Sequence, residues 1–354
     1  MQTALNIGVL GCGPVAQAAH FESAVKAHNT TLYAICDIAQ DLADRIGAMH
    51  GPAKIYYDYA EMLADPQLDA VVVATADAFH VDATAMALRA GKPVLCEKPL
   101  GLTVEEALTL ASTIEETEGF VQVGHMKRFD PGLQAARQFI DEGMGEMLAL
   151  KAWYCDSTHR YDLTDAVQPY MIRSERAKRP VENPKADLRK YYMLAHGSHL
   201  VDTARYFGGG IKAIRARYST RYGAHCWFAD VAFESGVLGH LDLTVAVRMD
   251  WHEGFQIYGE QGSILGKTFN PWLYKSSEVD IFDERRGAST RVLGADGHFY
   301  RRQLEAFADT VLTGNDHGAA TFQDGLASVQ AMVAMQQSAD SGDWVELASV
   351  GGGV

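Results

Sequence analysis

The stretch IGVLGCGPVA, residues 7–16, decides the fold of this chain. A short apolar run typical of a buried strand leads directly into a Gly-x-Gly-x-x-Ala turn, and a helical pattern of apolar residues opens immediately after it. The first glycine of such a turn permits a tight bend, and the second lets the backbone approach a pyrophosphate. A glycine-rich turn without a ligand is the alternative for this motif taken alone. The predicted cofactor contacts in the turn are Gly11, Cys12, Gly13, Pro14 and Val15.

The first third of the chain repeats this strand-then-helix order. Short apolar runs alternate with segments whose apolar residues recur at helical spacing, which is typical of a parallel, doubly wound α/β sheet. The further predicted strands are residues 32–36, 70–75, 93–96 and 121–124.

Several polar residues follow these strands and are expected at the carboxyl edge of the sheet, where open α/β folds bind ligands. Asp37 ends the second strand at the distance where a carboxylate binds the adenosine ribose hydroxyls. It would repel a 2′-phosphate, and neither Ile38, itself a predicted cofactor contact, nor Ala39 supplies a cation, so NAD is favoured over NADP. An exposed strand end or helix cap is the alternative for Asp37. After the third strand come Thr75, Ala76 and His80, which are predicted along the dinucleotide, although His80 can equally cap the next helix.

The pattern changes after residue 128, and strand-like runs joined by short turns dominate the remainder. Short connections favour antiparallel pairing, so we expect an α+β domain with a large, mainly antiparallel open sheet. Two late helices, residues 300–312 and 322–339, are expected to cover one face of that sheet. The predicted domains are residues 1–125, which bind the dinucleotide, and residues 126–354, which bind substrate and form the oligomer.

Composition narrows the function. The 354 residues carry a net charge of −14 at pH 7, which disfavours nucleic acid and anionic membranes as partners and favours a small molecule. The amino terminus shows no basic segment before an apolar run, so we expect a cytoplasmic protein. The five cysteines are scattered and odd in number, which predicts buried, reduced thiols and no metal site.

A further stretch, VLCEKPLG at residues 94–101, ends a predicted strand with Glu97, Lys98 and Pro99. Together with the glycine turn, Asp37 and the sequence GHMKRF at residues 124–129, it resembles the glucose-fructose oxidoreductase, inositol dehydrogenase and rhizopine-catabolism (Gfo/Idh/MocA) family. The resemblance covers nearly the whole chain. It implies a Rossmann domain followed by an open antiparallel sheet, with NAD as cofactor and substrate bound between the sheet and the nicotinamide.

By its matching position, Lys98 is the lysine that hydrogen-bonds the reacting hydroxyl, and it lies beside the cofactor with Glu97. Elementary electrostatics agrees with this role. An ammonium next to an oxidised nicotinamide meets a like charge, so its pKa should fall and it can exchange a proton with an alcohol. A solvated strand end is the alternative for Lys98.

The resemblance implies a second catalytic segment, a helix carrying Asp and His four residues apart. In LAHGSHLVD, residues 194–202, His199 matches the family histidine, but Ala195 stands where the aspartate would be. His199 is the predicted general base, since a near-neutral pKa suits that task. Either His196 or a residue from elsewhere must substitute for the missing carboxylate, or the substrate hydroxyl pattern differs. A helix-start or packing role is the alternative for His196.

Other residues are candidates for substrate contact. Cations concentrate between Arg173 and Lys190, just before the predicted catalytic helix, and could bind an anionic sugar derivative. A solvated loop or a subunit contact is the alternative. Arg128 and Tyr154 are also predicted to line the pocket, with Trp153 beside Tyr154 and ordinary sheet packing as the alternative for the aromatic residues.

These observations predict an NAD-dependent dehydrogenase that oxidises a secondary hydroxyl of a cyclic polyol, sugar or glycoside. One alternative is a non-catalytic NAD-binding regulatory protein, which the missing aspartate keeps open. The other is a carbonyl or imine reductase on the same fold. The open face of the second sheet needs a cover, so we expect a homodimer or homotetramer.

Overall fold

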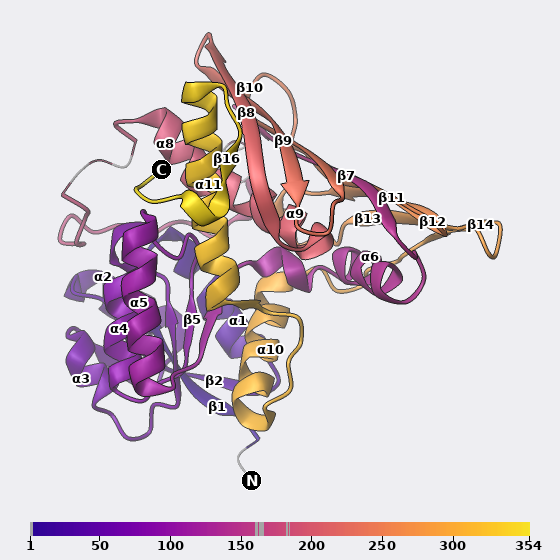
Figure 1. Cartoon of the computed structure of the whole chain (residues 1–354). Coiled ribbons are helices and arrows are strands. Elements are labelled where there is room, and N and C mark those ends of the chain that lie inside the picture. Colours follow the sequence, from indigo (N-terminus) through magenta and orange to yellow (C-terminus); the bar gives the residue numbers. More distant parts are fainter. Residues whose placement is uncertain (1–2, 160–161, 163–165, 182, 184) are drawn as a thin grey trace. The chain divides into compact units, whose positions relative to one another are not determined.

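The computed structural model of the chain describes residues 3–159, 162, 166–181, 183 and 185–354 (Figure 1). These residues form two compact units. The first contains residues 1–126, 168–186 and 300–326, and the second contains residues 127–167, 187–299 and 327–354. The first unit therefore includes two segments that lie far beyond the predicted boundary at residue 125.

The first unit is built on a seven-stranded sheet in the order β15-β6-β5-β4-β1-β2-β3. All its pairings are parallel except that of β15 with β6, as expected for a doubly wound fold with an antiparallel edge. The strands are β1 Leu5–Leu10, β2 Thr30–Cys36, β3 Lys54–Tyr56, β4 Ala70–Val73, β5 Val94–Cys96, β6 Val121–Val123 and β15 Ala320–Thr321. The five predicted strands are therefore confirmed, while β3 and β15 are too short to show a sequence pattern.

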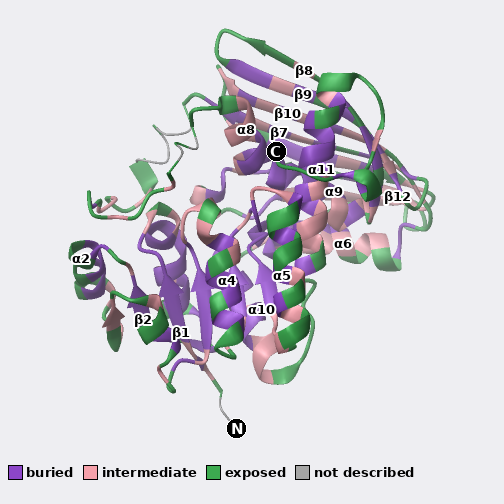
Figure 2. Ribbon diagram, turned by 60° about the vertical axis from the view of Figure 1, so that its left-hand side comes forward, coloured by how far each residue is buried: buried purple, intermediate pink, exposed green. Residues whose placement is uncertain are grey.

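Helices cover both faces of this sheet (Figure 2). Its strands β4, β5 and β6 are buried at every residue. One core joins the sheet to α3 Tyr59–Leu63, α4 His80–Arg89 and α5 Val104–Thr117. The other joins it to α1 Phe21–Lys26, α2 Gln40–His50 and α10 Phe299–Thr313.

The position of α10 corrects one prediction. Leu304, Phe307 and Ala308 are fully buried in the core of the first unit, with residues of β1, β2 and β4. The Phe307 ring stacks on Phe120 at 5.9 Å. The sequence predicts this helix but does not indicate which sheet it covers. We had assigned it to the second sheet.

The second unit is built on a nine-stranded sheet in the order β14-β13-β12-β11-β7-β10-β9-β8-β16. Its pairings are antiparallel apart from the parallel pair of β7 and β10, so the expected mainly antiparallel sheet is confirmed. The strands are β7 Met147–Ser157, β8 Ile211–Arg221, β9 Ala224–Phe233, β10 Leu238–Val247, β11 His252–Gly259, β12 Gly262–Thr268, β13 Glu278–Asp283, β14 Ala288–Arg291 and β16 Val345–Glu346.

One face of this sheet packs against helices, which are α6 Pro131–Glu142, α9 Ser198–Gly208 and α11 Phe322–Ser341. From α11, Gln336 accepts a hydrogen bond from the Trp227 indole on β9. The strand alternation leaves the other face open. Large apolar side chains on that open face are exposed, namely Phe228, Leu238, Tyr258 and Leu265.

All five cysteines are free thiols. Cys12, Cys36 and Cys96 are buried, as predicted, whereas Cys155 and Cys226 are half-buried. Burial raises the pKa values of Cys36 and Cys96 to about 12, so neither is a thiolate nucleophile near neutral pH.

Candidate functional site

A cavity of about 610 Å³ lies at the carboxyl edge of the seven-stranded sheet, entirely within the first unit. Eight of the predicted cofactor-binding residues line it: Gly11, Gly13, Pro14, Val15, Asp37, Ile38, Thr75 and Ala76. These residues come from the ends of β1, β2 and β4, which the parallel order brings to one edge.

The glycine turn has the geometry that a dinucleotide needs. Gly11 has φ +94°, and a Cβ placed there would lie 2.7 Å from the Ala74 carbonyl oxygen, so only glycine fits. A Cβ placed on Gly13 would meet nothing within 4 Å, which leaves its backbone accessible to a ligand. The turn therefore combines a tight bend at Gly11 with backbone at Gly13 that a ligand can approach closely.

Asp37 fixes this turn as well as facing the cavity. One carboxylate oxygen accepts a hydrogen bond from the Cys12 N–H at 2.8 Å, and the other accepts one from the Ala39 N–H at 2.9 Å. Each carboxylate oxygen retains a lone pair for a ribose hydroxyl. Cys12 itself is fully buried and does not line the cavity, so its contribution is the backbone N–H.

The cavity also has aromatic and long apolar walls that the sequence did not reveal, formed by Tyr57, Tyr59, Phe79 and Met86. Tyr57 and Tyr59 flank the start of α3, and Phe79 and Met86 come from the segment leading into α4 and from α4 itself. The sequence offered one signal for these wall residues. They lie in or just before helices that follow strand ends, and the first turns of such helices approach the ligand-binding edge of the sheet.

The basic segment before the predicted catalytic helix belongs partly to this unit. The Ile172 backbone is held at both its N–H and its carbonyl by the Gln17 amide, each at 2.9 Å. Ser174 donates a hydrogen bond to Asp41 at 2.8 Å. Ala177 and Lys178 then line the cavity, and the Lys178 ammonium lies 4.7 Å from the centre of the Phe79 ring. Arg173 is exposed and does not line the cavity.

Lys98 follows β5 in a segment that is fixed by a buried carboxylate. Glu97 is 4% exposed, and one of its oxygens accepts a hydrogen bond from His20 Nε2 at 2.8 Å. The other oxygen accepts the Lys98 backbone N–H at 3.2 Å. Burial alone would raise the pKa of Glu97, but the hydrogen bond from His20 and the charges of His20, Lys98 and His80 together hold that pKa below its ordinary value. Glu97 is therefore a buried carboxylate that fixes the backbone of the candidate catalytic lysine.

His80 is 1% exposed and does not line the cavity. Its ring nitrogens lie 2.8 Å from the Pro99 carbonyl oxygen and 3.2 Å from the Thr75 carbonyl oxygen. It thus joins the end of β4 to the segment that carries Lys98. Cofactor binding by His80 and by Glu97 would be indirect, through the backbone that each of them holds.

The second unit brings Tyr154, His196 and His199 together in a buried aromatic cluster. The Tyr154 and His199 rings are parallel within 4°, with centres 6.0 Å apart. The Tyr154 hydroxyl lies 3.3 Å from His196 Nδ1. Asp156, which the sequence did not single out, is 3% exposed and places a carboxylate oxygen 3.3 Å from His196 Nε2. Trp153 lies on the opposite, open face of the sheet, because neighbouring strand residues alternate.

A π-helical turn, η4 Met193–Gly197, interrupts the helix that carries these histidines, between α8 Leu188–Tyr192 and α9. Such a turn inserts an extra residue and shifts the helix faces. Ala195 and His196 both lie within it, so the expected pairing of residues four apart on a regular helix does not describe this segment.

The second unit also contains two buried ion pairs. Arg128 binds Asp202 with its Nε and Nη2 groups, which assigns Asp202 a structural role and occupies the guanidinium that was predicted to bind substrate. Lys127 pairs with Glu253, and its ammonium lies 4.6 Å from the centre of the Tyr154 ring. Burial outweighs that ammonium and raises the pKa of Glu253.

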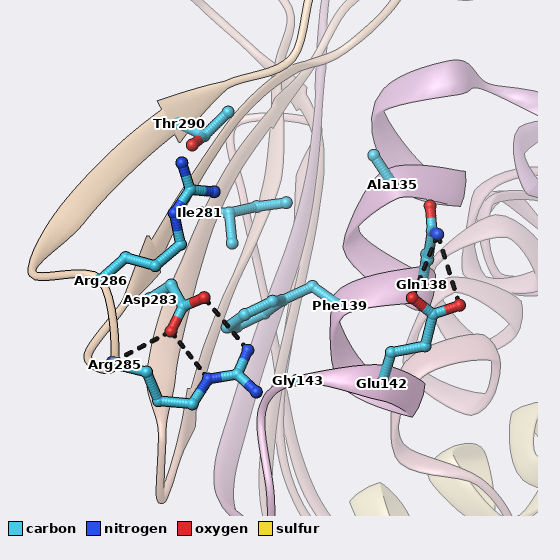
Figure 3. Close-up of a pocket in the computed structure, with 10 residues that line it drawn as sticks. All are labelled: Ala135, Gln138, Phe139, Glu142, Gly143, Ile281, Asp283, Arg285, Arg286 and Thr290. Carbon is cyan, nitrogen blue, oxygen red and sulfur yellow. Dashed lines mark hydrogen bonds and ion pairs between the residues drawn. The ribbon is translucent and has the colours of Figure 1, made fainter.

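A second cavity, of about 320 Å³, lies in the second unit between α6 and the β13–β14 hairpin (Figure 3). None of the predicted site residues lines it. Its Arg285 points at Asp283, and its Gln138 points at Glu142 along α6. Its polar groups are thus largely paired with one another.

Within the described part of the chain, no group of three or more His, Cys, Asp or Glu side chains is arranged to hold a metal ion. The helices of the described residues include none with the length and apolar character needed to cross a membrane.

The cavity and its glycine turn define a dinucleotide-binding domain. In agreement, residues 5–125 match the family described as "Oxidoreductase family, NAD-binding Rossmann fold", and residues 192–347 match its "C-terminal alpha/beta domain". The chain belongs to the Gfo/Idh/MocA family of oxidoreductases, and the predicted family and fold class are confirmed.

Individual relatives agree with this assignment. The chain is 30% identical over 353 residues to inositol 2-dehydrogenase 2 of Saccharopolyspora erythraea. The matched region covers 96% of this chain and 94% of that protein. The chain is 24% identical to 1,5-anhydro-D-fructose reductase of Ensifer adhaerens, over 96% of this chain and 98% of that one. A structure of scyllo-inositol dehydrogenase from Lactobacillus casei, with bound NAD(H) and scyllo-inositol, has the same fold, with a TM-score of 0.74, 21% identity, and coverage of 98% and 100%.

The buried Glu97 predicts a pH-dependent stability. We expect Glu97→Gln to lower the free energy of unfolding at pH 7 by about 1.5–3 kcal/mol, the range for hydrogen bonds to charged groups. Because the folded pKa of Glu97 lies below its ordinary value of 4.5, this contribution is present above pH 4.5. It should be lost as the pH falls through the folded pKa. Urea unfolding at several pH values measures the difference.

The control is Glu22→Gln, which removes an exposed carboxylate that pairs with Lys26 on α1. It should change stability little at any pH. A Glu97→Gln effect that stays constant down to the acid limit of the native protein would contradict the assigned charge.

Lys178 predicts a contribution to cofactor affinity, since it is a cation in a cavity that would hold the cofactor phosphates. Lys178→Ala should weaken NADH binding by about 1 kcal/mol, roughly fivefold in Kd, because the group is exposed and screened. Fluorescence titration at low and high salt measures this, and the loss should shrink as salt rises. Arg179→Ala removes the neighbouring cation, which does not line the cavity. An equal effect of both substitutions would rule out a specific role for Lys178.

Proposed function

We propose that this protein is an NAD-dependent dehydrogenase that oxidises a secondary hydroxyl of a cyclic polyol, sugar or glycoside, with an inositol-type compound as the first candidate. The observation that carries the proposal is Lys98, held by a buried Glu97 at the edge of the sheet that forms the dinucleotide cavity. The relatives named inositol 2-dehydrogenase and the neighbour bound to scyllo-inositol support the substrate class.

The residues of the first unit fit NAD. Gly11 provides the tight bend, Gly13 leaves room for the pyrophosphate, and Asp37 provides a carboxylate for the ribose hydroxyls. When bound, the nicotinamide supplies the chemistry of accepting a hydride. Asp37 would hold the ribose hydroxyls and exclude a 2′-phosphate. The backbone of the glycine turn would face the pyrophosphate.

Lys98 is proposed to hydrogen-bond the reacting hydroxyl, with its backbone fixed by Glu97. The proposed general base is His199, which takes the hydroxyl proton as the carbon loses its hydride. The parallel Tyr154 ring restricts the plane of the His199 imidazole. Direct substrate contacts by Tyr154, His196, Arg128 and Arg173 stay predictions. The ion pair with Asp202 already engages the Arg128 guanidinium, so Arg128 has the least support as a substrate contact.

The 1,5-anhydro-D-fructose reductase relative favours one alternative, reduction of a cyclic ketone with NADH. The two proposals share every residue role, because the proton and hydride transfers are reversible. They differ in which substrates are turned over.

We also propose that the enzyme works in the cytoplasm as a homodimer or homotetramer. Five free thiols suit a reducing compartment. The apolar side chains on the open face of the nine-stranded sheet favour a second copy of the chain as its cover.

Lys98→Ala tests the main proposal. With NAD and a panel of inositols, aldoses, glycosides and sugar acids, we expect NADH formation by the wild type. The variant should lose about 10²- to 10⁴-fold in kcat, since it lacks the ammonium that hydrogen-bonds the reacting hydroxyl and shares proton transfer with His199. NADH binding should persist, and Lys212→Ala, an exposed lysine on β8, should behave as wild type.

Tight NADH binding without turnover on any panel member would favour the non-catalytic regulatory protein. Oxidation of NADH only with ketone or imine acceptors would favour the reductase. Full activity of Lys98→Ala would contradict the assigned role.

Light scattering tests the oligomer. The wild type should be a dimer or tetramer at micromolar concentration, and Phe228→Glu with Leu265→Glu should release monomers by placing charges on the open face. The matched control is Leu293→Glu, a 91% exposed residue outside the sheet. A wild-type monomer would refute the expectation.

A further inference from the structure

The second unit contains a carboxylate that the proposed mechanism does not use. Asp156 is 3% exposed and lies near the end of β7. Burying a carboxylate is costly unless another group compensates for its charge. Asp156 lies two residues after Tyr154, so both side chains project from the same face of the strand, toward α9. The buried carboxylate is thus on the same side of the sheet as His199.

The ionisable neighbour of Asp156 is His196, which can compensate for the carboxylate by placing an N–H toward it. A carboxylate oxygen lies 3.3 Å from His196 Nε2, and both side chains are buried. A carboxylate facing one ring nitrogen favours a proton on that nitrogen. The other ring nitrogen, Nδ1, then carries the lone pair and can accept a hydrogen bond from the Tyr154 hydroxyl, 3.3 Å away.

Tyr154 transmits this orientation to His199. Its ring is parallel to the His199 imidazole within 4°, and the other neighbours of the ring are the Lys127 ammonium at 4.6 Å and the Trp251 ring at 5.0 Å. A ring packed in this way cannot rotate without losing these contacts. A continuous path of contacts therefore runs from Asp156 through His196 and Tyr154 to the proposed general base.

We propose that Asp156 and His196 form a positioning pair that sets the orientation of Tyr154 and His199, and that this pair replaces the helix carboxylate missing at Ala195. The inference rests on the proposed function of His199. The π-helical turn η4 explains how His196 can take over from position 195. Both residues lie in this turn, and its extra residue rotates the side chains relative to a regular α-helix.

The replacement has a consequence for specificity. Asp156 is buried and paired, so it orients protein groups and does not bind a substrate hydroxyl. The Ala195 methyl group cannot accept a hydrogen bond either. A preferred substrate should therefore tolerate a missing or substituted hydroxyl at the position that an aspartate at 195 would hold.

The test compares Asp156→Asn, which keeps the shape of the side chain, with His196→Gln and the double variant. Each single variant should lower kcat about 10- to 100-fold, the range for partners that orient a catalytic group, while the Kd for NADH stays unchanged. The double variant should be no worse than the poorer single variant, because the pair acts as one unit. Asp230→Asn is the matched control, since Asp230 forms an exposed pair with His240 at 3.0 Å in the same sheet.

A second readout does not depend on turnover. Nitrogen-15 NMR of the histidine rings should show wild-type His196 with its proton on Nε2, and Asp156→Asn should shift that ring toward the other tautomer. The proposal is overturned by a wild-type proton on Nδ1, by multiplicative losses in the double variant, or by unchanged kcat in Asp156→Asn. If no panel compound is turned over, the proposed function fails, and the NMR result still decides whether the pair exists.

Discussion

The burial of one carboxylate, Glu97, is the constraint on which the dinucleotide-binding unit depends. A buried carboxylate must be compensated, and here His20 and the Lys98 backbone N–H do so. His20 belongs to the helix that follows the glycine turn, in the π-helical segment η1 Ala16–His20. The same contact thus joins the turn that approaches the cofactor to the strand end that carries the candidate catalytic lysine. Neither feature can shift alone without leaving a charge unpaired in the core.

His20 and His196 both lie where a helix is interrupted by a π turn, and this limited what sequence alone could predict. The five main strands of the first sheet and the glycine turn were predictable, because short apolar runs and turn chemistry act over a few residues. Asp37 was predicted from its place at a strand end and Lys98 from its match to the family motif, and both roles stay predictions. The partners of His20 and His196 did not follow, since an extra residue in η1 and η4 shifts the helix face by an amount that no pattern of apolar residues encodes.

Other parts of the site escaped prediction because they depend on contacts between distant segments. Asp156 lies in an ordinary strand and becomes significant only through His196, forty residues later. Lys178 was read as part of a basic stretch near the substrate, but the Gln17 amide holds the preceding backbone beside the dinucleotide cavity. The helix α10 was predicted, whereas the sheet that it covers was not. Local periodicity determines which elements form, and long-range packing determines where they lie.

The first unit is assembled from three separate stretches of chain, and this bears on how the protein is made. Its core includes Leu304 and Phe307, which pack with β1 and β2 near the start of the sequence. A ribosome releases those first strands long before α10 emerges, so the part of the sheet that α10 covers stays exposed during most of translation. Closing so long a loop raises the contact order and slows folding, and an uncovered apolar face in that interval is a surface on which chaperones act.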